Sequence, residues 1–127
     1  MEVDEIAGAI VTAAIEIHED PGSGLFESVY EVLLARSLHR RGLRVDRQRS
    51  IDFVYDGIRF EQGFRLDLLV EDCVIVEIKS LDRLAPVHSK QVLTYLRLMK
   101  LPVGLLLNFG AERMIDGVKR IMNDRAG

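Results

Sequence analysis

Residues 73–79 read Cys-Val-Ile-Val-Glu-Ile-Lys, an apolar run that two charged residues interrupt, Glu77 and Lys79. A short run of this kind is typical of a central strand covered on both faces. Residues two positions apart on a strand project from the same face, so Glu77 and Lys79 share one face. Because a charged side chain on a buried strand is costly unless it is paired or bound to a metal, two of them require an explanation.

The preceding segment, Arg-Leu-Asp-Leu-Leu-Val at 65–70, carries Asp67 ten positions before Glu77. In an antiparallel hairpin the two carboxylates face each other if the turn has an odd number of residues, such as 71–73, or if a bulge restores the phase. We therefore predict an odd turn or a bulge between the two strands.

Two facing carboxylates form a hard oxygen site of the kind that Mg²⁺ or Mn²⁺ prefers, with waters completing the shell. A lysine beside them can orient or help deprotonate an attacking water and stabilise charge on a phosphate. These residues therefore indicate metal-assisted phosphodiester hydrolysis. The alternative is a buried ion pair of Lys79 with Asp67 or Glu77 that has no catalytic role.

The whole chain predicts an α/β sandwich with a mixed central sheet flanked by helices, in the order α-α-β-β-β-α-β plus a tail. Helices are expected over 4–19, 25–41 and 87–100, and strands over 51–55, 58–70, 73–79 and 103–108. Asp56-Gly57 is a hairpin turn signal, Gly63 a predicted kink, and 114–123 fits either a short strand or a helix. The apolar inner face expected for the second helix is Phe26, Val29, Leu33, Leu34 and Leu38.

With 127 residues, 48% apolar and 29% charged, the composition fits a single globular domain over 1–127. No apolar run approaches the roughly 20 residues that cross a bilayer, and an acidic N-terminus is unlike a secretory signal, so we expect no membrane association. The lone Cys73 excludes an internal disulfide framework and a zinc-thiolate site. It indicates a small buried hydrophobe in a reducing, cytoplasmic setting.

The net charge of −3 argues against a protein that coats nucleic acid, but not against a nuclease, because a bound metal reverses the field of a carboxylate cluster. Six arginines and one acid, Asp46, lie between Arg36 and Arg49. Two interpretations are open: a solvated helix end and strand, or a patch that follows a phosphate backbone.

Asp67-x9-Glu77-Ile78-Lys79 resembles the D-x(n)-(D/E)-x-K signature of the PD-(D/E)xK nuclease superfamily. Residues 24–30, Gly-Leu-Phe-Glu-Ser-Val-Tyr, resemble the G-x-x-E-x-x-Y motif of the GxxExxY proteins, a compact branch of it. The likeness covers nearly the whole chain. It implies a restriction-endonuclease-like core and a Mg²⁺-dependent (or Mn²⁺-dependent) nuclease that cleaves nucleic acid, with DNA expected. It also implies a metal shell made by Glu27, Asp67, Glu77 and the carbonyl of Ile78; from the residues alone, Glu27 is a solvated helix acid.

Gln91-Val92-Leu93-Thr94-Tyr95 resembles the Q-x-x-x-Y element of exonucleases in the same superfamily. Its i,i+4 spacing puts Gln91 and Tyr95 on one helix face. Gln91 would hold the metal-bound water or a phosphate. Residues expected to contact nucleic acid are Tyr95, Tyr30, His88 and Lys90. The alternatives are packing roles for the two tyrosines and ordinary surface positions for His88 and Lys90.

Three functions compete. The first is a metal-dependent nuclease, which the presence of Glu27, Asp67, Glu77 and Lys79 together favours. The second is a non-catalytic module that keeps the fold and binds nucleic acid or protein. The third is a structural subunit of a larger complex. A homodimer would widen a small binding surface, with the strand Leu105–Leu107 or the first helix as its support.

Overall fold

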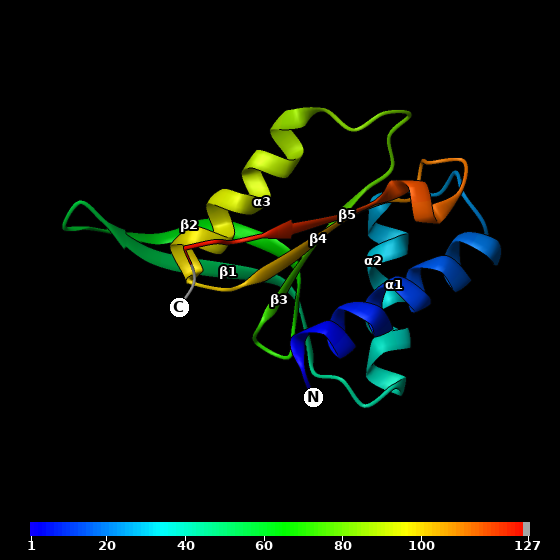
Figure 1. Cartoon of the computed structure of the whole chain (residues 1–127), viewed down its shortest axis with the longest axis horizontal. Coiled ribbons are helices and arrows are strands. Elements are labelled where there is room, and N and C mark those ends of the chain that lie inside the picture. Colours follow the sequence, from blue (N-terminus) through cyan, green and yellow to red (C-terminus); the bar gives the residue numbers. More distant parts are fainter. Residues whose placement is uncertain (126–127) are drawn as a thin grey trace.

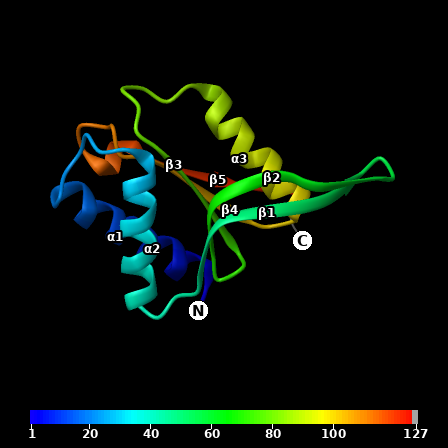
Figure 2. The same cartoon turned by 180° about the vertical axis from the view of Figure 1, so that it is seen from behind.

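A five-stranded mixed sheet in the order β1-β2-β3-β4-β5 lies between two helical layers in the computed structural model, which describes residues 1–125 (Figures 1 and 2). The strands are β1 (Val45–Tyr55), β2 (Ile58–Val70), β3 (Val74–Lys79), β4 (Val103–Asn108) and β5 (Val118–Met122). β3 and β4 run parallel because helix α3 (Pro86–Met99) connects them, whereas the other neighbours are antiparallel. The predicted fold class and element order are confirmed, and the structure adds a fifth strand.

Helices α1 (Val3–Glu19) and α2 (Glu27–Arg40) cover one face of the sheet. The apolar stripe of α1 is buried: Ile6, Ile10, Ala13, Ala14 and Ile17. The inner face predicted for α2 is partly wrong, since Phe26 and Val29 are exposed and Leu33 is half-buried. Phe26 is the extended residue before the helix, so the stripe is set by later residues: Tyr30, Glu31, Leu34, Ala35 and Leu38.

Helix α3 covers the opposite face. It packs so closely on β4 that a Cβ added to Gly104 would lie 2.6 Å from a methyl carbon of Val92. On β3, the side chains of Val74, Val76 and Ile78 belong to the hydrophobic cluster under α1 and α2, whereas Ile75 belongs to the cluster under α3. Because side chains alternate along a strand, Glu77 and Lys79 lie on the α3 face.

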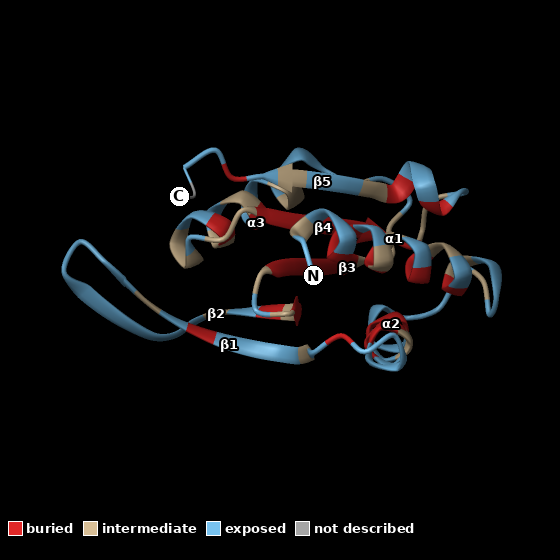
Figure 3. Cartoon of the chain, turned by 60° about the horizontal axis from the view of Figure 1, so that its bottom comes forward, coloured by how far each residue is buried: buried red, intermediate tan, exposed pale blue. Residues whose placement is uncertain are grey.

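β1 and β2 form a long hairpin whose distal end extends beyond the other strands and is exposed (Figure 3). The predicted turn at Asp56-Gly57 is confirmed, and both residues have positive φ. The predicted kink is also confirmed: the register shifts between Ile51 and Phe53, opposite the segment that contains Gly63. A Cβ on Gly63 would lie 2.2 Å from the ring of Phe53, so the close approach requires glycine here.

β1 begins six residues earlier than predicted, because Val45 pairs with Val70 and extends the ladder. The segment 114–123, for which the sequence fits either a short strand or a helix, contains a 3₁₀ turn (Met114–Gly117) followed by strand β5. β4 lies between β3 and β5 with Leu105–Leu107 buried, so this strand offers no surface for the suggested homodimer. No helix in the described part of the chain has the length and apolar character required to cross a membrane.

Candidate active site

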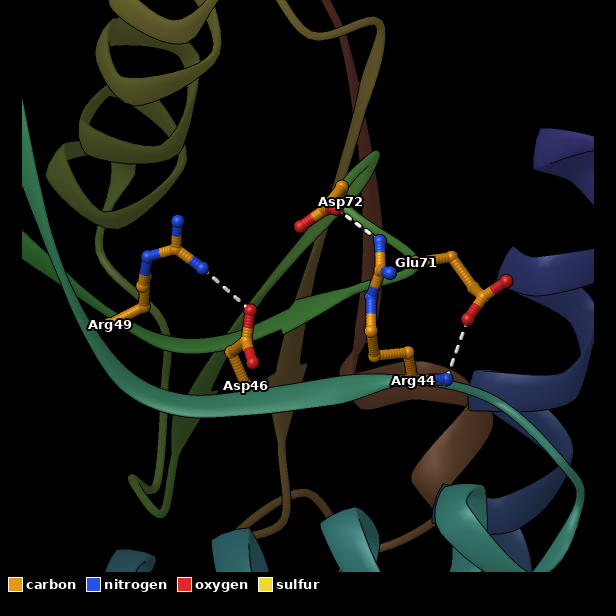
Figure 4. Close-up of polar contacts among 5 residues, drawn as sticks. All are labelled: Arg44, Asp46, Arg49, Glu71 and Asp72. Atoms are coloured by element: carbon orange, nitrogen blue, oxygen red, sulfur yellow. Dashed lines mark hydrogen bonds and ion pairs between the residues drawn. The ribbon is translucent and has the colours of Figure 1, made fainter.

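The turn between β2 and β3 contains three residues, since Val70 pairs with Val74. The predicted odd turn is therefore confirmed. Arg44, just before β1, anchors it (Figure 4): the Arg44 amide donates to the Glu71 carboxylate at 2.6 Å, the Glu71 amide donates to the Arg44 carbonyl at 2.8 Å, and the Arg44 guanidinium pairs with Asp72. Glu71 and Asp72 both have positive φ, which is a strained backbone conformation for residues with side chains. The contacts with Arg44 help to hold the turn in this conformation.

The third turn residue, Cys73, is half-buried rather than fully buried as predicted. Burial raises the pKa of its thiol, and the charges of Glu71 and Asp72 raise it further. The thiol is therefore protonated and unreactive at neutral pH, as expected of a residue that serves packing.

The register of the turn brings Asp67 and Glu77 together. β2 and β3 pair through Leu68 and Val76, and continuing this register places Asp67 opposite Glu77. At that point the backbone amides of the two strands donate to side-chain carboxylates instead of to backbone carbonyls. The Asp67 amide donates to Oε2 of Glu77 at 3.1 Å, and the Ile78 amide donates to Oδ2 of Asp67 at 2.8 Å. Each carboxylate is thus fixed by a backbone amide of the neighbouring strand.

The environment of this pair disfavours two negative charges. Glu77 is only 6% exposed. Burial raises the pKa of Glu77 to about 9, and the charge of Asp67 and a hydrogen bond with its carboxyl add to the rise, while Lys79 opposes it. Without a further cation, Glu77 is therefore protonated at neutral pH.

Lys79 is half-buried, two positions beyond Glu77 and opposite Asn108 of β4. Within residues 1–125, no carboxylate oxygen lies within 4 Å of its ammonium group. The direct buried ion pair that was the alternative explanation for Lys79 is therefore not formed. Its charge reaches Glu77 at longer range, where it lowers the pKa of that carboxyl.

Glu27, the first residue of α2, contacts the chain just after the C-terminal end of β3. Its Oε2 accepts the Ser80 amide at 3.3 Å. It lines an open groove of about 750 Å³ together with Ser80, Asp82 and Gly110. Among the residues that the structure describes, no three carboxylate, imidazole or thiol side chains converge on a point that could hold one ion. The predicted ligand set is therefore assembled only in part.

The donor chemistry of the pair itself fits a divalent cation. Among the described residues neither carboxylate forms an ion pair with a basic side chain, and the neutral amide of Gln48 lies 3.5 Å from Asp67. A cation would relieve the repulsion that now raises the pKa of Glu77. Asp67 and Glu77 are the two carboxylates that could take part in holding such a cation.

Comparison with known proteins assigns the family. A model of the PD-(D/E)XK nuclease superfamily matches residues 4–121. The chain belongs to this superfamily. No curated protein and no solved structure matches the chain. The matched range contains Asp67, Glu77 and Lys79.

Helix α3 presents part of the predicted nuclease site. Tyr95 is half-buried and its ring stacks on Phe64, with centroids 4.2 Å apart and planes 5° from parallel. Burial raises the pKa of Tyr95, and the charges of Glu77 and Asp67 raise it further. Gln91, one turn earlier, is exposed. The roles expected of Gln91 and Tyr95 stay predictions.

His88 and Lys90 lie at the start of α3, where their environments differ. Nδ1 of His88 accepts the Ala85 amide at 3.0 Å and so caps the helix. Lys90 is exposed, and within residues 1–125 its ammonium has no carboxylate partner. Lys90 is therefore available to bind an anion, whereas His88 also caps the helix.

Tyr30 requires a correction. It is completely buried, and its ring stacks on Phe109 with centroids 4.2 Å apart. Its hydroxyl donates to the Gly22 carbonyl at 2.8 Å and accepts the Leu25 amide at 3.0 Å. No surface remains for the predicted contact with nucleic acid. Tyr30 instead holds the loop between α1 and α2 against the core.

The arginine-rich segment forms ion pairs with nearby acids. Four of its six arginines take part: Arg41 with Glu16, Arg44 with Asp72, Arg47 with Glu31, and Arg49 with Asp46 (the second and fourth in Figure 4). Acids therefore compensate these four charges, which favours the interpretation as a solvated helix end and strand. Contact of this segment with a phosphate backbone stays a prediction.

The sequence interpretation missed two residues beside the pair, Glu31 and Gln48. Glu31 is 5% exposed and accepts hydrogen bonds from Arg47 and Gln48. The Gln48 amide also lies 3.5 Å from Oδ1 of Asp67. A signal was present for Glu31, because it falls in the helical stripe with Leu34 and Leu38 and is the one acid there. No sequence signal identified Gln48.

Proposed function

We propose that this protein is a metal-dependent nuclease that hydrolyses phosphodiester bonds in nucleic acid, with DNA as the substrate class. The observation that carries the proposal is the Asp67–Glu77 pair, in which Glu77 is buried and Asp67 half-buried, with Lys79 on the same face of β3 as Glu77. Two adjacent carboxyl groups, one of them buried without a compensating cation, are costly to a domain, so their presence near a lysine without a carboxylate partner supports a functional role.

In this proposal Asp67, Glu77 and the carbonyl of Ile78 hold Mg²⁺ or Mn²⁺, and Glu27 is a further ligand from the α2 side. The metal, when bound, supplies Lewis-acid stabilisation and an activated water. Lys79 orients that water and stabilises charge on the phosphate, since its ammonium is not committed to a carboxylate among the described residues. Gln91 holds the water or a phosphate oxygen.

The charge of α3 supports a nucleic-acid substrate on this face. The helix contains His88, Lys90 and Arg97 and no acidic residue. Tyr95, half-buried on the same helix, would contact a nucleotide. The motif around Glu27 supports the narrower assignment to the GxxExxY branch, and the lone half-buried Cys73 supports a cytoplasmic setting.

The second candidate is a non-catalytic module that binds nucleic acid or protein. One observation favours it: Glu27 does not converge with Asp67 and Glu77 into a three-ligand cluster within residues 1–125. Cation binding and cleavage distinguish the two functions.

The test is a calorimetric Mn²⁺ titration of the full chain, followed by cleavage assays on labelled DNA and RNA. Asp67→Asn and Glu77→Gln keep the side-chain volume and remove a charge. Glu61→Gln is the matched control, because Glu61 is an exposed acid on the same hairpin. The nuclease proposal requires saturable Mn²⁺ binding that both site variants lose and the control keeps.

Lys79→Met then separates the functions, with exposed Lys119→Met as its control. A nuclease loses cleavage in Lys79→Met while it keeps Mn²⁺ binding. If the wild type neither binds Mn²⁺ in the presence of an oligonucleotide nor cleaves any substrate, the non-catalytic module is the correct function.

A further inference from the structure

Gln48 occupies an unusual place in β1, opposite Asp67. The neighbouring pairs are Arg47 with Leu68 and Arg49 with Leu66, but Gln48 and Asp67 themselves do not pair through their backbones. The backbone of Gln48 has φ of 50°, in the left-handed region. A residue with a side chain adopts this region at a cost of roughly 1–2 kcal/mol, so the surrounding contacts must hold it there.

The side chain of Gln48 connects two carboxylates. Its amide nitrogen donates to Oε1 of Glu31 and lies 3.5 Å from Oδ1 of Asp67. An amide nitrogen carries two hydrogens, so both carboxylates can be served at once. Glu31 is held in turn by Arg47, whose Nε and Nη2 donate to Oε2 at 3.2 and 3.0 Å.

This chain of contacts decides how Asp67 is held. Oδ2 of Asp67 accepts the Ile78 amide at 2.8 Å, and Oδ1 faces Gln48. With a partner on each oxygen, the carboxylate plane cannot rotate freely. Without Gln48, Oδ1 would lose this partner, and only the Ile78 amide and the neighbouring Glu77 carboxyl would hold the group.

We propose that Gln48 is a positioning residue that fixes the carboxylate of Asp67 for the reaction, with Glu31 and Arg47 anchoring Gln48 from behind. Its catalytic meaning rests on the function proposed above. Hydrogen-bond partners behind a metal ligand orient that ligand, and their loss costs 10- to 100-fold in metal affinity or activity in other proteins. Gln48 is such a partner behind Asp67, the proposed metal ligand.

The chain offers a matched control. Gln62 lies in the same hairpin, also has φ of 50° and is exposed, and its side chain makes no hydrogen bond within residues 1–125. Gln48→Met and Gln62→Met therefore make the same chemical change at the same backbone conformation. Gln48→Asn is a second variant: asparagine tolerates the left-handed region, but its shorter side chain cannot reach both carboxylates.

Two measurements on the full chain test the proposal. The first is hydrogen exchange of the Ile78 amide by NMR in EDTA, which reports the Asp67 contact without any metal. The second is the Mn²⁺ dissociation constant by calorimetry. We expect Gln48→Met and Gln48→Asn to accelerate Ile78 exchange relative to its neighbours and to raise the dissociation constant by about 10-fold or more. Gln62→Met should leave both unchanged.

Unchanged exchange at Ile78 in both Gln48 variants would overturn the positioning role. So would equal effects of Gln48→Met and Gln62→Met, because the change would then follow from the backbone alone. If Ile78 exchange depends on Gln48 but the wild type neither binds Mn²⁺ in the presence of an oligonucleotide nor cleaves any substrate, the positioning of Asp67 is supported and the proposed nuclease function fails. The two failures are therefore distinguishable.

Discussion

Leu66 and Leu68, two positions apart on β2, are both completely buried but lie in different hydrophobic clusters on opposite faces of the sheet. In a regular strand they would share a face. The reversal occurs at Asp67, opposite the left-handed residue Gln48. Asp67 therefore occupies the point where β2 turns over, with its carboxylate directed to β3 rather than into either core.

The face reversal predicts selective energetic coupling. Leu66 shares its cluster with Leu96 of α3, whereas Leu68 belongs to the cluster under α1 and α2. Each substitution to alanine should cost about 2–5 kcal/mol. In double-mutant cycles by urea unfolding, Leu66→Ala should couple with Leu96→Ala by about 0.5 kcal/mol or more, and Leu68→Ala should be additive with it. Equal coupling of both leucines to Leu96 would contradict the reversal.

Tyr30→Phe tests the structural role of the tyrosine in the G-x-x-E-x-x-Y segment. The variant keeps the stack on Phe109 but leaves the Gly22 carbonyl and the Leu25 amide without their partner. We expect a loss of about 1–3 kcal/mol in the free energy of unfolding, measured with urea. Tyr55→Phe, at an exposed tyrosine, is the control. A fully stable Tyr30→Phe that loses affinity for nucleic acid would restore the binding role.

Asn108→Asp tests how the segment after β3 is held. The buried Asn108 side chain accepts the amides of Leu81 and Gly110 and donates to the Leu81 carbonyl at 2.9 Å. An ionised carboxyl accepts but cannot donate, and it would face that carbonyl. We expect a loss of about 1–3 kcal/mol at pH 7 that shrinks at low pH, where the protonated carboxyl can donate again. Chemical denaturation at pH 7 and pH 4 measures it, and a loss independent of pH would contradict this explanation.

Much of the site was predictable because strand geometry is discrete. Alternation puts Glu77 and Lys79 on one face, and the parity of the turn decides whether Asp67 faces Glu77. The three-residue turn was predicted because Asp67 and Glu77 can face each other only across an odd turn or a bulge, and not from the turn propensity of its residues. The contacts of Arg44 that stabilise the turn could not be predicted, since they depend on where β1 begins.

The remaining features depend on tertiary contacts that no local pattern encodes. A helix that starts at Glu27 directs Tyr30 and Glu31 inward and leaves Phe26 outside, so a two-residue error in the start misplaces the whole face. The acids that compensate the arginine-rich segment, such as Glu16, lie far away in sequence. Gln48 acquires its role from one left-handed backbone angle, which composition and periodicity do not reveal.

Glu77→Gln should change how stability depends on pH in the absence of metal. The pKa of Glu77 is about 9 in the folded protein, above its ordinary value of 4.5, so folding takes up a proton between these limits. The stabilisation from this group is complete below about pH 4.5 and is lost as the pH rises towards 9. The neutral amide of the variant has no such dependence. We therefore expect Glu77→Gln to gain stability relative to the wild type as the pH rises.

Thermal unfolding in EDTA at pH 5.5, 7 and 8.5 measures this difference, with Glu61→Gln as the exposed control. The control and the wild type should follow parallel curves, whereas Glu77→Gln should diverge upwards. Mn²⁺ should reverse the order at high pH, because the proposed cation takes the place of the proton on Glu77 and stabilises the wild type and Glu61→Gln but not Glu77→Gln. Parallel curves for all three proteins would mean that Glu77 is ionised in the metal-free fold, and the repulsion inferred for the pair would be wrong.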